Sequence, residues 1–392
     1  FDCSGLVWRV LERHGVLLLR NSSEMCFRDP QLVPVRRDQL APGDLLFFGT
    51  AERIDHVAFW AGDGEVLQAT QYGVPSTKET AFESERLAPR FRYARRLAAL
   101  PGAPRPSGLT NAKAKALRKE LDAIAAGTKA TFGIVVKDLG TGVTVKRNAA
   151  TVMHAASTMK TAVLLEALRR IDEGSLSLST GVPVVDCFPS MVDGSAFRVE
   201  LEKGGDERIA PFLGGTARLD FVAREMIVRS SNVATNLMLG LCPPKDVQRF
   251  VDALGAPTLK VRRMVEDTKA YEAGISNETD AEGMAALMEA AVRTPKLSAE
   301  SRRIAFEILA AQEFNDQIPA GIPKQAGAVV AHKTGTISKV QHDSAVVRLP
   351  DGREYVLVLL ATDFGANEEG RKAVVEATRK MSRAVWEAMV AP

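Results

Sequence analysis

The hydrophobic positions of the first ninety residues change from a helical to a strand period. After Cys3, apolar residues recur on one helical face, which predicts a helix with Val7 and Val10 on its buried side. From about residue 40, short apolar runs bounded by turn residues predict strands, and Asp63-Gly64 predicts a tight turn between two of them. The strands are expected at 45–48, 56–61 and 65–69. A helix followed by antiparallel strands predicts an α+β domain.

Helical and strand periods also alternate after residue 110. An amphipathic helix is predicted around Leu117 and Leu121, followed by a hairpin formed by Thr131–Lys137 and Val143–Arg147. Helices are expected after Ser157, within 219–311 and at 367–389, and further strands at 328–332, 343–349 and 354–361. Strands at both ends with helices between them predict an α/β domain in which helices cover an antiparallel sheet, with an all-helical lobe beside it.

Two segments between these blocks contain many turn residues. The run from Leu97 to Thr110 is rich in Pro, Gly and Ala, which predicts a semi-rigid linker. The expected organisation is therefore a first domain at 1–97, a linker at 98–110 and a second domain at 111–392. Residues 181–215 also contain several Gly and Pro and are expected to be irregular.

Composition narrows the class of protein. The chain has 392 residues, of which 46% are hydrophobic and 25% charged, and this is typical of a globular protein with two domains. No apolar run approaches the roughly 18 residues of a membrane span. The net charge of +3 is small and the basic residues are scattered, so nucleic-acid binding is not predicted. The four cysteines are too few and too dispersed for a disulfide scaffold or a zinc site, and no cofactor is expected. Cys187 and Cys242 are expected to be buried.

Candidate chemistry in the second domain begins at Ser157. A lysine one helical turn later, Lys160, places an amine on the same helical face, where it can take the proton of the hydroxyl. That spacing makes Ser157 a candidate nucleophile and Lys160 a candidate base. The face of the same helix that is expected to be buried carries Val163, Leu164, Ala167, Leu168 and Ile171.

Two more motifs follow in order along the chain, Ser230-Ser231-Asn232 and Lys333-Thr334-Gly335. With S-x-x-K, S-x-N and K-T-G in sequence, the region from about Leu109 to the end resembles the penicillin-recognising serine hydrolases, and most of all their class A β-lactamase branch. The resemblance implies an acyl-enzyme mechanism. An alternative for Ser230 and Asn232 is helix capping, which both residue types do well.

The resemblance also implies roles for the neighbouring residues. Ser230 relays a proton to the leaving nitrogen and Asn232 holds a substrate amide. Lys333 and Thr334 bind the substrate carboxylate, and Gly335 lets the substrate lie against the strand. The backbone N–H groups of Ser157 and Thr336 form the oxyanion hole.

The base for deacylation is left open between two readings of one loop. Class A enzymes carry a water-activating glutamate in the loop that precedes an N-x-T-type segment, here Asn277-Glu278-Thr279. Counting back without gaps places Met264 at the position of that glutamate. Glu266 takes the position only if the loop is shorter, and a solvated surface role is its alternative.

Candidate chemistry in the first domain centres on Cys3. A cysteine at a helix N-terminus is favoured as the thiolate by the helix dipole and the unpaired N–H groups. His56 and Gln68 lie twelve residues apart on the paired strands of the predicted hairpin, so Gln68 can orient the imidazole. A thiolate, an imidazole and a polar orienting residue form a cysteine-peptidase arrangement.

The segments D-C-S-G-L-V, P-G-D-L-L-F-F and D-H-V-A-F-W are similar to those of the NlpC-type peptidoglycan cysteine peptidases, which have a papain-like fold. The similarity extends to about Arg96. It implies Cys3 as nucleophile, His56 as general base and Gln68 as the orienting residue, with peptide stems of the bacterial cell wall as substrate. The chain starts inside the motif without Met, so it is expected to be a fragment or a processed product.

Both resemblances concern the same polymer. The predicted function is a cell-wall hydrolase with a cysteine endopeptidase site and a serine acyl-enzyme site for D-alanyl peptides or β-lactams. One alternative is a genuine β-lactamase fused to a cell-wall-targeting module, and another is a peptidoglycan-binding protein whose first domain is inactive. The substrate implies a location outside the cytoplasm.

Overall fold

The structure is a computed structural model in which the chain divides into two compact units, the first formed mainly by residues 1–106 and the second mainly by residues 107–392. It describes residues 2–13, 16, 18, 23–27, 29, 31–50, 53–69, 77–80, 82–97, 108–201, 205–365 and 367–390. Positions 98–107, most of the predicted linker, lie outside the described residues.

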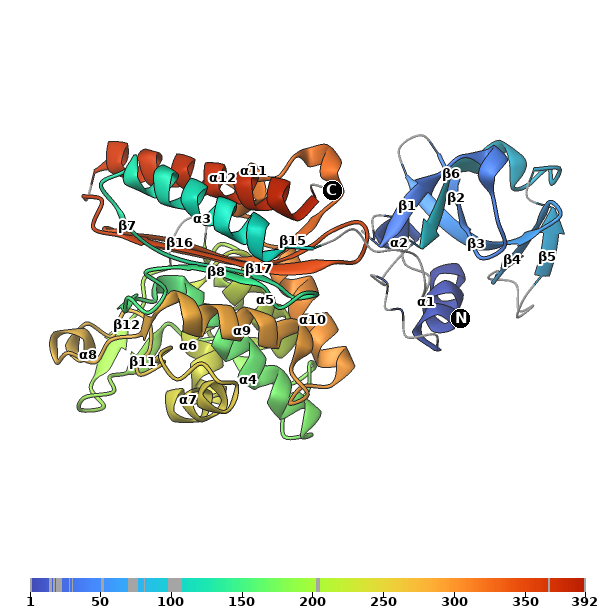
Figure 1. Ribbon diagram of the computed structural model, residues 1–392. Coiled ribbons are helices and arrows are strands. Elements are labelled where there is room, and N and C mark those ends of the chain that lie inside the picture. The colour runs from blue at the N-terminus through green and yellow to red at the C-terminus, as the bar shows by residue number, and fades with distance from the viewer. Residues whose placement is uncertain are drawn as a thin grey trace. The chain divides into compact units, whose positions relative to one another are not determined.

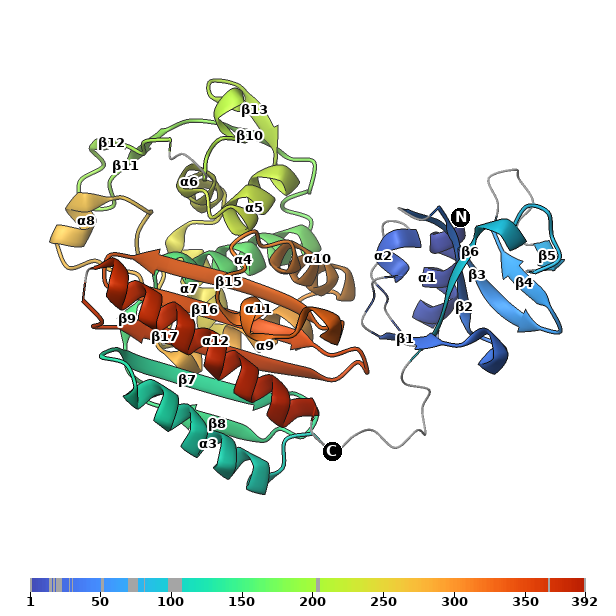
Figure 2. The same ribbon diagram turned by 90° about the horizontal axis from the view of Figure 1, so that it is seen from above.

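The first unit is a six-stranded sheet in the order β1-β6-β2-β3-β4-β5, with two helices. The elements are α1 (Cys3–Arg13), α2 (Ser23–Phe27), β1 (Leu32–Val35), β2 (Leu45–Gly49), β3 (Ile54–Gly62), β4 (Glu65–Gln68), β5 (Thr77–Thr80) and β6 (Phe91–Leu97). Helices α1 and α2 pack against β3, as Figure 2 shows. Alternating residues of β2 point to opposite faces, so Phe47 joins a core with Val7 and Phe48 joins a second core with Leu87. The predicted α+β first domain is confirmed.

The second unit is built on a five-stranded sheet in the order β15-β16-β17-β7-β8. Its strands are β7 (Thr131–Asp138), β8 (Thr144–Arg147), β15 (Val329–Ile337), β16 (Val340–Arg348) and β17 (Glu354–Thr362). Helices α3 (Asn111–Ala126) and α12 (Glu368–Val390) lie on one face of the sheet, and α9 (Ala281–Arg293) lies on the other (Figure 1). Val374, Met381 and Val385 of α12 are fully buried, as the apolar period of this helix predicts.

Helices of the lobe continue from the α9 face of the sheet (Figure 1). They are α4 (Lys160–Asp172), α5 (Leu219–Val228), α6 (Asn232–Leu241), α7 (Pro244–Ala253), α8 (Thr268–Glu272) and α10 (Ala299–Ala310). The short helix α11 (Ile318–Gly321) packs instead against α12, on the other face of the sheet (Figure 1). Two short strands, β9 (Met153–His154) and β14 (Glu278–Thr279), pair beside the start of α4. A sheet with helices on both faces and a helical lobe confirms the predicted fold class of the second domain.

Three sequence predictions need correction in detail. Ser157 lies in a 3-10 turn, Ala156–Met159, and the α-helix begins only at Lys160. Ile171 is half-buried rather than buried, because it lies in the last turn of α4. Strand β15 continues from Val329 through the K-T-G motif, whereas the predicted strand stopped before it.

Residues 181–215 contain more regular structure than the sequence predicts. Strands β10 (Gly181–Pro183) and β13 (Thr216–Arg218) pair, and so do β11 (Cys187–Pro189) and β12 (Ala196–Arg198). Side chains of β11 alternate between exposed and buried, which places Phe188 inside and Cys187 outside. The prediction that Cys187 is buried is therefore wrong, whereas Cys242 is fully buried.

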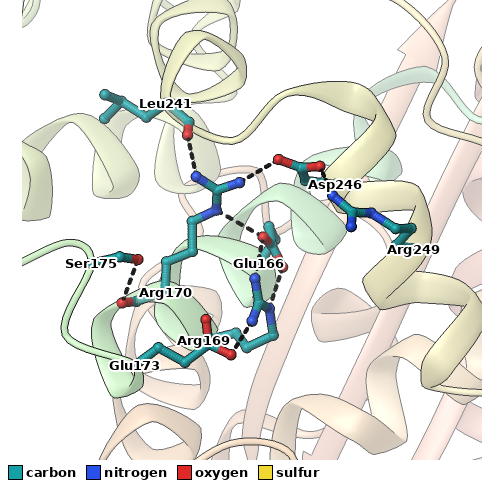
Figure 3. Close-up of polar contacts among 8 residues, drawn as sticks. All are labelled: Glu166, Arg169, Arg170, Glu173, Ser175, Leu241, Asp246 and Arg249. Atoms are coloured by element: carbon teal, nitrogen blue, oxygen red, sulfur yellow. Dashed lines mark hydrogen bonds and ion pairs between the residues drawn. The ribbon is translucent and has the colours of Figure 1, made fainter.

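A buried carboxylate on α4 is neutralised by two arginines of the same helix (Figure 3). Glu166 is fully buried and accepts hydrogen bonds from Arg169 Nε at 2.7 Å and from Arg170 Nε at 2.9 Å. Arg170 also bonds to Asp246 of α7 and to the carbonyl oxygen of Leu241, which ends α6. These contacts raise the pKa of both guanidinium groups, chiefly through the hydrogen bond to Glu166. The cluster joins three helices of the lobe.

Replacing Glu166 with Leu is expected to lower the free energy of unfolding of the second unit by about 3 kcal/mol. The reason is that two partly buried guanidinium groups lose the one fully buried carboxylate that they share, so that Arg169 keeps only Glu173 and Arg170 only Asp246 as a counter-charge. Urea denaturation measures the change. Lys372→Gln is the matched control, because Lys372 and Glu368 form an i,i+4 pair that is 76% and 72% exposed. An effect of Glu166→Leu no larger than that of the control would contradict the prediction.

Among the described helices, none combines the length and the apolar character needed to cross a membrane. This observation concerns the helices alone.

Candidate active sites

Ser157 lies on the wall of a pocket of about 820 Å³ in the second unit. The turn that presents it is tightly fixed. Ala156 has a φ of +45°, which is rare for a residue with a side chain, and its N–H donates to His154 Nδ1 at 2.9 Å. Thr158 and Met159 on the other side of Ser157 are fully buried. The turn therefore holds the Ser157 side chain at the pocket while its neighbours anchor the backbone.

Lys160 occupies the first turn of α4 and is fully buried. Its Nζ donates to the carbonyl oxygen of Ser230 at 2.6 Å and to Asn232 Oδ1 at 2.9 Å, and lies 3.3 Å from Ser230 Oγ. The S-x-x-K and S-x-N motifs, 70 residues apart, thus meet at this amine. A buried lysine with polar contacts on several sides is held in one place, as a proton-transfer group requires.

The S-x-N motif caps α6 with its middle residue. Ser231 Oγ accepts from the backbone N–H of Ala234 at 2.9 Å, and Ser231 is buried. The capping alternative for Ser230 and Asn232 is therefore wrong. Ser230 has a φ of +59° and turns its hydroxyl toward the two lysines, while Asn232 lines the pocket. The cap fixes α6 and leaves both flanking side chains available for chemistry.

Lys333 reaches the same hydroxyl from β15. Its Nζ donates to Ser230 Oγ at 3.0 Å and to the carbonyl oxygen of Thr334 at 3.0 Å. Burial lowers the pKa of Lys333 well below its usual range, and the positive charge of Lys160 lowers it further, while Asp343 acts in the opposite direction. Two amines that share one hydroxyl therefore disfavour each other's charged form.

The remainder of the K-T-G motif forms the strand edge beside Ser157. A Cβ at Gly335 would lie 3.2 Å from the backbone nitrogen of Ser157 and 3.0 Å from Thr158 Cγ2. Any side chain at position 335 would therefore crowd the turn that presents the nucleophile. Thr334 and Thr336 line the pocket on either side of this glycine. The sites predicted for the oxyanion hole and for the substrate carboxylate thus lie on one pocket wall.

Glu266 enters the same pocket, whereas Met264 is a buried residue outside its lining. Asn232 Nδ2 donates to Glu266 Oε1 at 2.7 Å, and the Oδ1 of the same amide accepts from Lys160. Glu266 has a φ of +64°. The preceding residue, Val265, is fixed through both of its backbone groups by Asn236, at 2.8 and 2.9 Å. The loop thus places Glu266, and not Met264, against the Asn232 amide in the pocket.

Two residues that support the pocket escaped the sequence analysis. Asn236 follows Asn232 by four residues on α6, so the i,i+4 spacing on one helix face was a usable signal. His154 accepts the backbone N–H next to Ser157, and only its position three residues before the nucleophile pointed to it. Burial, followed by the positive charge of Arg263, lowers the pKa of His154, which favours the neutral imidazole that accepts this bond.

The second candidate site lies at the start of α1. Asp2 Oδ1 accepts from the backbone N–H of Gly5 and from Ser4 Oγ at 3.1 Å, so it caps the helix. Cys3 follows directly and is partly exposed. Its Sγ lies 3.2 Å from Ser23 Oγ at the start of α2. Ser23 was missed because a serine between two helices carries no periodic signal.

His56 and Gln68 complete this site from the β3–β4 hairpin. His56 Nε2 donates to Gln68 Oε1 at 2.5 Å, and Gln68 is fully buried. This bond leaves Nδ1 for the thiol. Burial raises the pKa of Cys3, but hydrogen bonds from His56 and Ser23 and the charge of His56 lower it more, so that the net shift is downward. The structure thus brings together the three residues that the sequence predicts.

No cluster of three or more His, Cys, Asp or Glu side chains within the described part of the chain is arranged to hold a metal ion.

The second unit matches one known family along nearly its whole length. Residues 116–389 match the beta-lactamase enzyme family. A beta-lactamase from Rhodobacter capsulatus is 25% identical over 71% of this chain and 90% of its own. The structure of a PBP-A mutant in an acyl-enzyme complex with penicillin G superposes with a TM-score of 0.58 at 25% identity. That match covers 70% of this chain and 96% of the PBP-A chain.

The first unit matches a different family. Residues 1–89 match the NlpC/P60 family. The probable endopeptidase p60 of Listeria innocua is 34% identical over 74 residues, which are 19% of this chain and 15% of that protein. The chain thus spans only a small part of that relative. Both families are typically extracytoplasmic and act on β-lactams or peptidoglycan. The chain therefore belongs to the beta-lactamase enzyme family through residues 116–389 and matches the NlpC/P60 family over residues 1–89.

Proposed function

We propose that the chain is a peptidoglycan hydrolase with two active sites, in which Ser157 forms an acyl-enzyme with D-alanyl peptides or β-lactams. One observation carries the proposal for the second unit. The Asn232 amide accepts from Lys160 and donates to Glu266, so the three side chains form one hydrogen-bonded line in the pocket that Ser157 lines. Such a line supplies a base for each of the two steps of an acyl-enzyme reaction.

Acylation of Ser157 uses the two lysines and Ser230. Lys160 first gives up its proton, and the neutral amine then accepts the Ser157 Oγ proton while Oγ bonds to the carbonyl carbon of the substrate. The carbonyl oxygen gains negative charge and is stabilised by the backbone N–H groups of Ser157 and Thr336. When the carbon–nitrogen bond breaks, the leaving nitrogen takes a proton from Ser230, whose hydroxyl lies 3.3 Å from Lys160 Nζ and 3.0 Å from Lys333 Nζ. The proton on Lys160 then replaces the one that Ser230 gave.

Deacylation uses Glu266. Its carboxylate takes a proton from a water molecule while the water oxygen bonds to the ester carbon. Cleavage of the bond to Ser157 Oγ then returns the proton to that oxygen and releases a carboxylic acid. Asn232 holds Glu266 by the hydrogen bond of 2.7 Å, so base and nucleophile face one cavity. Lys333 and Thr334 are the proposed binding groups for a substrate carboxylate, which supports an anionic peptide or β-lactam as the substrate.

Intact mass measured over time after addition of benzylpenicillin tests this proposal, with Ser157→Ala as the control. The expected result for the wild type is loss of the drug with an adduct that forms and then disappears, and neither event in Ser157→Ala. A persistent adduct would instead indicate a D,D-peptidase or penicillin-binding role. If the wild type shows no adduct and no loss of the drug, the proposal for the second unit is overturned.

The first unit is proposed to be the second catalytic site, with Cys3 as nucleophile, His56 as base and Gln68 as the residue that orients the imidazole. The support is the lowered pKa of Cys3 together with the bond between His56 and Gln68. The proposed substrates are peptide stems of peptidoglycan, and the proposed location is outside the cytoplasm, where that polymer lies. The alternative of an inactive binding domain predicts a Cys3 thiol that is slow to react.

A further inference from the structure

A small hairpin without an assigned role stands beside the Glu266 loop. Strands β11 and β12 pair from Cys187 with Arg198 to Pro189 with Ala196. The rings of Phe188 and Phe197, directly opposite each other, lie 6.1 Å apart and fill its inner side. At the tip, the Ser190 N–H donates to the carbonyl oxygen of Ser195 at 2.8 Å. The segment is therefore an ordered unit, which we call the 187–198 hairpin.

The tip of the 187–198 hairpin holds the residue that follows Glu266. Asp267 is 1% exposed, and its Oδ1 accepts from Ser190 Oγ at 2.9 Å while its Oδ2 accepts from the Met191 N–H at 2.8 Å. Asp267 Oδ1 also caps α8 by accepting from the Ala270 N–H at 3.1 Å. A buried carboxylate with three donors is fixed in position, because leaving any of these groups unpaired is costly.

A second set of contacts reaches the hairpin from α8. Lys269 Nζ lies 3.0 Å from Asp193 Oδ2 and 2.6 Å from Ser195 Oγ. Both charged side chains are about half exposed, so this pair contributes much less than the buried Asp267 contacts. The two sets lie on the same tip, which limits both displacement and rotation of the loop.

Glu266 thus lies between two fixed neighbours. Val265 is fixed to α6 through Asn236, and Asp267 is fixed to the 187–198 hairpin. Between them Glu266 has a φ of +64°, which costs a residue with a side chain of order 1 kcal/mol and persists only when the surroundings enforce it. Without the hairpin contacts, the chain after Glu266 is free to relax this dihedral and to swing the carboxylate away from Asn232.

We propose that the 187–198 hairpin positions Glu266 for deacylation, acting through Ser190 and Asp267. The inference rests on the proposed function of the second unit and assigns a structural role to residues 187–198. Ser190 and Asp267 are positioning residues, because the hydrogen bonds of Asp267 go to Ser190, Met191 and Ala270, away from Glu266 and Ser157, although Asp267 is part of the pocket lining. Displacement of a reacting group by about 1 Å can slow a reaction about a hundredfold. Even a small displacement of the Glu266 carboxylate is therefore expected to slow deacylation measurably.

Two variants weaken the hydrogen bonds between Asp267 and the 187–198 hairpin by different amounts. Ser190→Ala removes one donor to Asp267 and is expected to slow loss of the benzylpenicilloyl adduct about fivefold. Asp267→Asn turns one acceptor into a donor that faces the hairpin, and it is expected to slow loss of the adduct about thirtyfold. For both variants, the rate of acylation of Ser157 should stay within about twofold of the wild-type rate. Arg198→Gln is the matched control, because Arg198 lies at the far end of the same hairpin and is 68% exposed.

A double-variant comparison separates positioning from a general loss of structure. If the hairpin acts through Glu266, adding Ser190→Ala to Glu266→Gln should leave the adduct lifetime unchanged, since the base is already absent. Equal slowing by Ser190→Ala in both backgrounds would overturn the proposal. So would unchanged deacylation in both Ser190→Ala and Asp267→Asn.

Amide hydrogen exchange provides a readout that needs no activity. In Asp267→Asn, a peptide that covers residues 265–272 should exchange at least about threefold faster, while α12 exchanges as in the wild type. Unchanged exchange in that peptide would show that the contacts of Asp267 with the 187–198 hairpin do not fix the loop. Failure of the proposed function gives a different result, because the wild type would then form no adduct while the exchange difference would remain.

Discussion

Glu266→Gln is expected to turn a transient acyl-enzyme into a lasting one. Glutamine has the shape of glutamate, and its Oε1 can still accept the hydrogen bond from Asn232 that Glu266 accepts at 2.7 Å. It cannot take a proton from water, so deacylation should slow by about a hundredfold to ten-thousandfold, the usual contribution of a general base. Acylation should change little, because it uses Lys160 and Ser230. Rapid mixing with benzylpenicillin followed by mass measurement separates the two rates.

Met264→Leu is the control for this prediction. Met264 is 8% exposed and lies two residues before Glu266, at the position that a gapless count assigns to the base. A volume-conserving change there should leave both rates close to those of the wild type. The opposite pattern, with Glu266→Gln turning over normally, would show that Glu266 is not the base and would leave deacylation to another group.

The lysine and serine motifs could be predicted because each is a local pattern whose spacing is set by a helix or a strand. The structure brings Lys160, Ser230 and Lys333 together, although 173 residues separate the two lysines in the sequence. The helix boundary was less predictable, since the turn at Ser157 depends on the left-handed conformation of Ala156. No propensity favours that conformation in alanine.

The position of Glu266 could not be derived in the same way. Whether residue 264 or residue 266 enters the pocket depends on the path of the loop, and contacts from α6 and from the 187–198 hairpin set that path. Strands of three residues such as β11 and β12 carry too short a period to be recognised. By contrast, the meeting of His56 with Gln68 could be expected from the hairpin, because residues on one face of paired strands lie within reach. The register pairs Phe59 with Leu67, so the two side chains meet diagonally rather than directly opposite each other.

His56→Ala is expected to abolish most of the activity of the first unit. The imidazole is the proposed base for Cys3, so cleavage of purified peptidoglycan should fall by about a hundredfold to ten-thousandfold. Release of stem-peptide fragments, separated by chromatography, measures the loss. Arg36→Gln serves as the control, because Arg36 forms an exposed ion pair with Asp38 that is 76% and 63% exposed. Wild-type cleavage in His56→Ala would mean that another group activates the thiol.

The state of the Cys3 thiol gives the same prediction a readout that does not depend on substrate. His56 lowers the pKa of Cys3 by hydrogen bonding and by charge, whereas burial raises it. Without the imidazole, burial still raises the pKa of Cys3. The pKa therefore moves up, and the thiolate fraction at pH 7 falls. Labelling of Cys3 by iodoacetamide should slow by about tenfold in His56→Ala, and its pH profile should shift to higher pH. Cys187 is exposed and calibrates the reagent in the same sample. If Cys3 is unreactive already in the wild type, the first unit binds peptidoglycan without cutting it, since no thiolate is then available to attack.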